Sequence, residues 1–179
     1  WRGGVNGKWR WLLFDTDFGF GIWNINAYQN NTLNFATAIN GPEWPNPPWS
    51  TLILRKLLEN NSFKTSFINC FSDFSNTIFK SSEVVGKINH MAAAIEQEII
   101  RHGQRWNQFS LASWLQNVQV LRTFAEQRIS LMRNHFSQKF GLGASVALYI
   151  LISDTIKGSV KLNSLELKQP SWYGNYFIG

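Results

Sequence analysis

Apolar side chains recur at helical spacing from about residue 50 to residue 140, and this pattern constrains the fold more than any other feature of the chain. We predict four helices there, each bounded by residues that commonly cap or stop a helix. The predicted helices run from Ser50 to Glu59, from a Ser62 cap through Ile78, from Ser82 to Gly103, and from Ser110 to Gly141.

The second of these helices has a broad aromatic stripe, and the third and fourth each have an apolar line that should face a core. The stripe consists of Phe63, Phe67, Cys70, Phe71, Phe74 and Ile78; the lines consist of Val84, Ile88, Met91, Ile95 and Ile99, and of Leu111, Trp114, Val118, Leu121, Ala125, Arg128, Met132 and Phe136.

Less regular segments flank the helices. Lys8 to Phe14 alternates apolar side chains on one face and predicts a strand, whereas residues 22–48 are rich in Asn, Gly and Pro and predict an irregular loop. After Gly143 the runs ASVALYILI and GSVKLNSLEL predict strands. We therefore expect a mainly α fold with a small β component, divided into residues 1–143 and a β-strand tail, 144–179, that starts a truncated β module. Both ends of the chain look like the boundaries of a fragment.

Composition and charge exclude several classes of protein. Nine Trp and fourteen Phe among 179 residues favour a globular fold over disorder, and no apolar run approaches the roughly 20 residues of a membrane span. The single cysteine, Cys70, excludes an internal disulfide and a cysteine-rich zinc site, and its aromatic neighbours predict a buried thiol. The net charge of +6 comes from scattered Lys and Arg, so a nucleic-acid partner is not expected.

An acidic turn follows the predicted strand. In Phe14-Asp15-Thr16-Asp17-Phe18-Gly19 the two carboxylates are one residue apart, and in extended backbone they point to the same side. Like charges so placed repel unless a cation lies between them, and Mg²⁺ prefers one or two carboxylates together with phosphate oxygens. The turn is therefore a candidate metal site for phosphate transfer. The alternative is an ordinary solvated turn or a helix cap.

Several stretches, taken in order, resemble the C-terminal half of the CotH kinase family, named for spore coat protein H. They are GKWRWLLFDTDFGFG, then WPNPPWSTLILRKLLENNSFKTSFINCFSDFSNTIF, then the helix end from Ile95 to Trp106, then WLQNVQVLRTFAEQRISLMRNHF, and together they cover roughly residues 7–140. The resemblance implies the helical part of an atypical protein-kinase-like fold, in which Asp15 and Asp17 bind metal. Asp15 ranks first because it directly follows the strand, although Asp17-Phe18-Gly19 mimics the kinase tripeptide.

The same resemblance implies an ATP- and Mg²⁺-dependent parent protein that phosphorylates Ser or Thr of other proteins and is secreted or located at the cell envelope. The family's nucleotide-gripping lysine, its acidic partner and the catalytic aspartate have no counterpart in this chain, so the chain alone should be inactive. The rival hypothesis is a non-catalytic surface module that binds polysaccharide or mediates adhesion. Its mark would be exposed aromatic side chains, and Trp44, Trp49, Trp172 and Tyr173 are the candidates.

Isolated polar residues have simpler interpretations. His90, His102 and His135 lie on different predicted helices, which favours surface or capping roles over metal binding. Arg122, Arg128 and Arg133 could contact phosphate. Because only Arg128 falls on an apolar line, an ion pair with a carboxylate is its default role.

Overall fold

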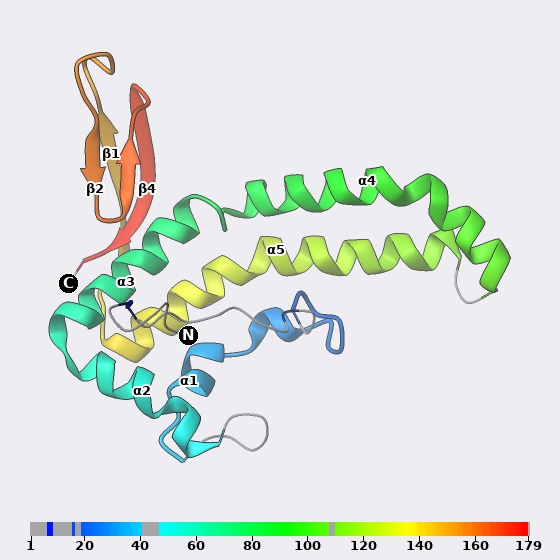
Figure 1. The fold of residues 1–179 in the computed structure, drawn as a ribbon, viewed down its shortest axis with the longest axis horizontal. Helices are drawn as coiled ribbons and strands as arrows, with labels where there is room; N and C mark the ends of the chain where they lie inside the picture. Colours follow the sequence, from blue (N-terminus) through cyan, green and yellow to red (C-terminus); the bar gives the residue numbers. More distant parts are fainter. Residues whose placement is uncertain (1–6, 9–15, 17–18, 41–46, 108–109, 179) are drawn as a thin grey trace.

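A computed structural model of the chain describes residues 7–8, 16, 19–40, 47–107 and 110–178. Within them the order of elements is η1 (Ala27–Gln29), α1 (Thr32–Ala36), α2 (Pro48–Glu59), α3 (Asn61–Asn76), α4 (Ser81–Trp106), α5 (Leu111–Phe140), β1 (Ser145–Leu151), β2 (Val160–Leu162), β3 (Leu165–Leu167) and β4 (Ser171–Phe177). The structure is mainly helical with a small β component at the C-terminal end, which confirms that part of the predicted fold class (Figure 1). Of the predicted strand at Lys8 to Phe14, all but Lys8 lies outside the described residues.

The ends of the helices show which residues act as caps. Asn60 ends α2, and its side chain accepts a hydrogen bond from the Phe63 N–H at 3.0 Å, so the cap of α3 is Asn60 and the predicted Ser62 cap is wrong. α4 continues past Gly103 to Trp106 and ends where Asn107 adopts a left-handed conformation, which corrects the predicted stop. The Ser110 start and the Gly141 stop of α5 are confirmed.

The loop predicted over residues 22–48 contains two short helical elements, η1 and α1. The side chain of Asn31 accepts a hydrogen bond from the Asn34 N–H at 3.0 Å and so caps α1. Leu33 of α1 is buried with Ile68 of α3 and Phe136 of α5, and aromatic rings surround this cluster. The rings of Phe71 and Phe136 stack with centroids 3.8 Å apart. Phe67 and Phe71 of the predicted stripe therefore pack on a core, whereas Phe74 and Ile78 are exposed and α3 ends at Asn76, before Ile78.

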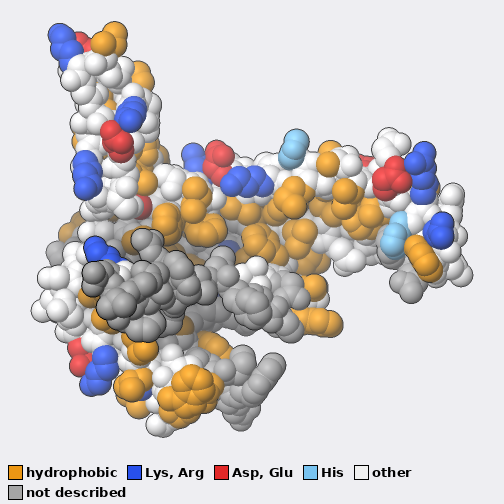
Figure 2. Space-filling view, in the orientation of Figure 1, with side chains coloured by type: hydrophobic (Ala, Val, Ile, Leu, Met, Phe, Trp, Pro, Cys, Tyr) orange, Lys and Arg blue, Asp and Glu red, His pale blue; other side chains and the backbone are white. Residues whose placement is uncertain are grey.

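α4 and α5 form a long helix pair that extends away from this core (Figure 1). No residue of α4 is fully buried, and Met91 on its predicted buried line is 69% exposed. The expectation of a buried line is thus wrong for most of α4, because α5 covers only one flank of that helix. Figure 2 shows hydrophobic side chains gathered along the pair.

The two predicted strand runs after Gly143 are confirmed as β1 and as β2 with β3, and the structure adds β4, which the sequence did not predict; the strands form two antiparallel pairs, β1 with β4 and β2 with β3. Leu167, Trp172 and Tyr176 form a second buried cluster, to which β1 contributes Leu148 and Ile150. The β strands therefore have a small core of their own, while Phe177 of β4 packs on the aromatic core of the helices. None of the described helices has both the length and the apolarity that a membrane span requires.

Candidate functional site

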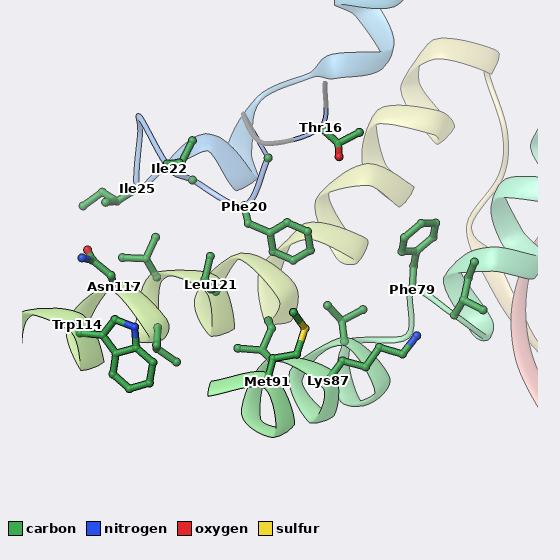
Figure 3. A pocket seen from close by; sticks show the side chains of 17 residues that line it. Thr16, Phe20, Ile22, Ile25, Phe79, Lys87, Met91, Trp114, Asn117 and Leu121 are labelled. Carbon is green, nitrogen blue, oxygen red and sulfur yellow. The ribbon is translucent and has the colours of Figure 1, made fainter. Parts of the chain in front are cut away.

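A pocket of about 720 Å³ lies between the N-terminal segment, the start of α4 and the first half of α5 (Figure 3). Three stretches of chain line it. They contribute Thr16, Gly19, Phe20, Gly21, Ile22 and Ile25; Ile78, Phe79, Val84, Lys87, Ile88 and Met91; and Trp114, Asn117, Val118, Val120 and Leu121. The lining is mostly apolar, and Lys87 is the charged side chain among these residues. The pocket could hold a ligand with an apolar body and a negative group.

A tight turn forms the N-terminal wall of this pocket. The Gly19 N–H donates a hydrogen bond to the Thr16 carbonyl at 3.3 Å, and the Ile22 N–H donates to the Gly19 carbonyl at 3.4 Å. Phe20 and Gly21 both have positive φ, +55° and +85°. A Cβ at Gly21 would lie 3.1 Å from Val120 Cγ1, so glycine permits both this conformation and the close approach to α5. The turn therefore packs directly on α5.

The side chain of Phe20 also holds this turn against α5. Its ring packs on Phe124 of α5 with centroids 5.0 Å apart, and in Figure 3 it points into the space between α5 and α4. Packing of one aromatic ring on another stabilises such a contact beyond the burial of area. The segment that follows the acidic motif is thus held on α5 by an aromatic contact as well as by a close backbone approach.

Arg128 of α5 anchors the next part of the N-terminal segment. Its guanidinium donates to the carbonyls of Tyr28 and Asn30, at 2.8 and 2.6 Å, and to the Thr32 hydroxyl at 2.7 Å. Burial lowers the pKa of this guanidinium. Its acceptors within the described chain are carbonyl and hydroxyl oxygens, and no carboxylate of that part of the chain pairs with it. Arg128 connects α5 to η1 and α1, which lie just beyond the pocket wall.

The predicted metal ligands Asp15 and Asp17 lie outside the described residues. Thr16, which stands between them in the sequence, is exposed and lines the pocket. Among the residues that the structure does describe, no three His, Cys, Asp or Glu side chains come together as a metal site would require. The metal site therefore stays a prediction that rests on the acidic pair itself.

A second polar centre, which sequence analysis missed, surrounds Asp73 of α3. This side chain is fully buried, and each of its carboxyl oxygens accepts two hydrogen bonds. Oδ1 accepts from Tyr176 Oη at 2.8 Å and Asn163 Nδ2 at 3.2 Å, and Oδ2 accepts from the Ser164 N–H at 2.9 Å and Ser164 Oγ at 2.6 Å. Burial and the bond to Asp73 raise the pKa of Tyr176 well above its usual range. Asp73 thereby joins α3 to β4 and to the β2–β3 turn.

Asn76 extends this connection one turn further along α3. Its amide donates to the Asn175 carbonyl at 2.9 Å and accepts from the Asn175 N–H at 3.0 Å, so it pairs with β4 as a neighbouring strand would. Arg133 of α5 donates to the same Asn175 carbonyl at 3.0 Å and to Ser75 Oγ at 2.6 Å. The polar run Ser72-Asp73-Phe74-Ser75-Asn76 inside an aromatic helix is the sequence signal that marks this centre.

The three histidines and Cys70 lie at separate places in the described chain. His90 and His102 are exposed, as predicted. His135 is half-buried, and its Nδ1 has no hydrogen-bond partner within the described chain, which corrects a simple surface role. Burial and then the positive charge of Arg128 lower the pKa of His135. Cys70 is half-buried, and its thiol pKa is raised by burial and by Asp73, so it is a weak nucleophile.

The aromatic side chains proposed for exposure divide between surface and core. Trp49 is 76% exposed and Tyr173 is exposed, as predicted, whereas Trp172 is only 8% exposed and belongs to the β core. Trp44 lies outside the described residues. Trp23 and Trp106 are also exposed, although they were not among the candidates. The exposed aromatic side chains therefore lie in different parts of the chain.

Comparison with known proteins shows the family of this chain. A family model described as CotH kinase protein matches residues 1–132, which includes the acidic turn, the three walls of the pocket and most of α5. No curated protein and no solved structure matches the chain.

Proposed function

We infer the function of this chain from one premise: it belongs to the CotH kinase protein family. We propose that it is the metal-binding part of an atypical kinase-like phosphotransferase, in which Asp15 and Asp17 hold Mg²⁺. The bound ion would neutralise charge on the phosphates of ATP, which is the main chemical demand of phosphate transfer. The observation that carries the proposal is that the family match includes the acidic pair and that Thr16, between the two aspartates, lines the pocket.

The described residues support the proposal by fixing the segment that follows the acidic pair. Gly21 and Phe20 hold the segment after the acidic pair against α5, and Arg128 holds η1 and α1 to the same helix. A metal ligand works only when its backbone is fixed, because small displacements weaken the positioning of phosphate groups. Lys87 adds positive charge on the opposite wall of the pocket.

We further propose that the chain acts within a longer protein and is inactive alone. This proposal rests on the resemblance, which implies that the groups that grip the nucleotide and orient the acceptor hydroxyl have no counterpart in this chain. The acceptor is proposed to be Ser or Thr of a protein, and the location to be outside the cell or at its envelope, as expected for a family named after a spore coat protein.

Phosphate transfer from ATP by the full-length protein that contains this chain tests the proposal. Asp15→Ala and Asp17→Ala should each reduce the rate by about a hundredfold or more, because each removes a charge that the metal needs. Asp154→Ala is the matched control, since Asp154 lies in the β tail beside Lys157, far along the chain from the pocket walls. Wild-type rates in both single variants would reject the assignment.

A second candidate function is a non-catalytic surface module that binds polysaccharide. Exposed Trp23, Trp49 and Trp106 favour it, because aromatic faces stack on sugar rings. Quenching or shifting of Trp fluorescence by cell-surface polysaccharide, lost in Trp49→Ala, would support this function. An unchanged spectrum would leave the phosphotransferase proposal alone.

A further inference from the structure

Lys87 places a positive charge in the wall of the pocket between α4 and α5. It lies near the start of α4, and residues three and four apart on a helix share one face. Val84 and Met91, which lie at those spacings from Lys87, also line the pocket. The described residues that line this pocket include no Asp or Glu, so Lys87 sets the sign of its charge.

The ammonium of Lys87 has no anionic partner in the described chain. The ion pairs in that part of the chain all join other basic side chains to carboxylates. Glu83, one turn earlier on α4, lines two neighbouring surface pockets together with Lys87 but does not pair with it. Lys87 is also exposed, so its charge is available to an anion from outside the chain.

Lys87 and Thr16 lie toward the same end of this pocket. In Figure 3 they come from opposite walls, α4 and the N-terminal segment, whereas Trp114 and Asn117 lie toward the other end. Thr16 stands between the two proposed metal ligands in the sequence, so Lys87 belongs to the end of the pocket that is nearer the acidic turn. The apolar side chains around Lys87 lower the local dielectric constant, which strengthens its attraction for an anion.

We propose that Lys87 binds the phosphate chain of the nucleotide, an inference that rests on the proposed function. The phosphate chain carries several negative charges, and the carboxylates of the acidic turn repel it wherever the metal does not neutralise them. A lysine ammonium is a compact point charge that binds phosphate. The resemblance implies that the family's nucleotide-gripping lysine has no counterpart in this chain. Lys87 is therefore an additional phosphate contact, supplied by α4.

Calorimetric titration of the full-length protein that contains this chain, with Mg²⁺ and either ATP or inorganic tripolyphosphate, tests this contact. Tripolyphosphate has the phosphate chain without the sugar and base. Lys87→Met should weaken the binding of both probes by about tenfold or more, because a hydrogen-bonded charge is lost. Lys87→Arg keeps the charge and should retain most of the affinity. Lys80→Met is the matched control, since Lys80 caps the same end of α4 but is not among the residues that line the pocket.

A second measurement separates Lys87 from the metal ligands. Binding of Mn²⁺ to the 179-residue chain should be the same in Lys87→Met and in the parent, because Lys87 contacts phosphate and not the metal. Parental affinity for tripolyphosphate in Lys87→Met, or an equal loss in Lys80→Met, would overturn the role of Lys87 and leave the proposed function standing if Asp15→Ala still abolishes phosphate transfer. A full-length parent that binds neither ATP nor tripolyphosphate would overturn the proposed function as well.

Discussion

Replacing Asp73 with alanine should detach the β strands from the helices. The substitution removes both acceptors of four hydrogen bonds and leaves the donors on Tyr176, Asn163 and Ser164 without their buried partner. At about 1 kcal/mol for each bond, the expected loss in the free energy of unfolding is about 4 kcal/mol. This is a large share of the roughly 5–15 kcal/mol that stabilises a typical domain.

Urea unfolding followed by far-ultraviolet circular dichroism measures this loss, and amide exchange in β4 reports whether the strands detach first. Tyr176→Phe removes one of the four bonds and should cost about 1 kcal/mol. Glu59→Ala is the matched control, because the Glu59 carboxylate is exposed and pairs with Lys56 on the surface, so its removal should cost about 0.5 kcal/mol or less. If Asp73→Ala costs no more than Glu59→Ala, the reasoning about this buried centre is refuted.

Three further predictions follow from other contacts. Gly174→Ala should cost about 2 kcal/mol in urea unfolding, because a Cβ there would collide with the Trp172 ring and lie 2.9 Å from Asn76 Cγ; a fully stable variant would contradict this close approach. Arg128→Met should cost about 2 kcal/mol and accelerate amide exchange in η1 and α1, since three oxygens lose their donor; exchange that does not change would show that the anchor is unnecessary. The lowered pKa of His135 means that the folded state disfavours its protonation, so stability should fall as the pH drops below its ordinary pKa of 6.5. His135→Asn should reduce that loss in melting temperatures measured between about pH 7.5 and about pH 5.

The sequence was sufficient to predict the helices that have a strong apolar period. α3 and α5 lie where the aromatic and aliphatic spacing placed them, and β1, β2 and β3 lie within the two predicted strand runs after Gly143, whereas β4 was not predicted. The ends of the helices were less predictable. A glycine such as Gly103 can lie inside a helix when the residues after it remain helical, as they do up to Trp106. Short α1 was missed because its five residues carry too little periodicity.

Features that depend on distant parts of the chain could not be predicted. The period of α4 shows an apolar face, but it does not tell which element covers that face, and Met91 is exposed. Asp73 and its partners are about 90 residues or more apart in sequence. Such a pairing leaves no local pattern beyond an acidic residue on an aromatic helix. The acidic turn differs from Asp73 in this respect. Its motif is local and can be found in the sequence, whereas Asp15 and Asp17 lie outside the described residues.

The central claim is that Asp15 and Asp17 together bind a divalent cation. Titration of the 179-residue chain with Mn²⁺, followed by electron paramagnetic resonance of the free ion, tests that claim without requiring phosphate transfer. We expect saturable binding that is lost in the double variant Asp15→Asn/Asp17→Asn and retained in Asp154→Asn. Binding that is unchanged in the double variant, or absent from the parent chain, would contradict the account.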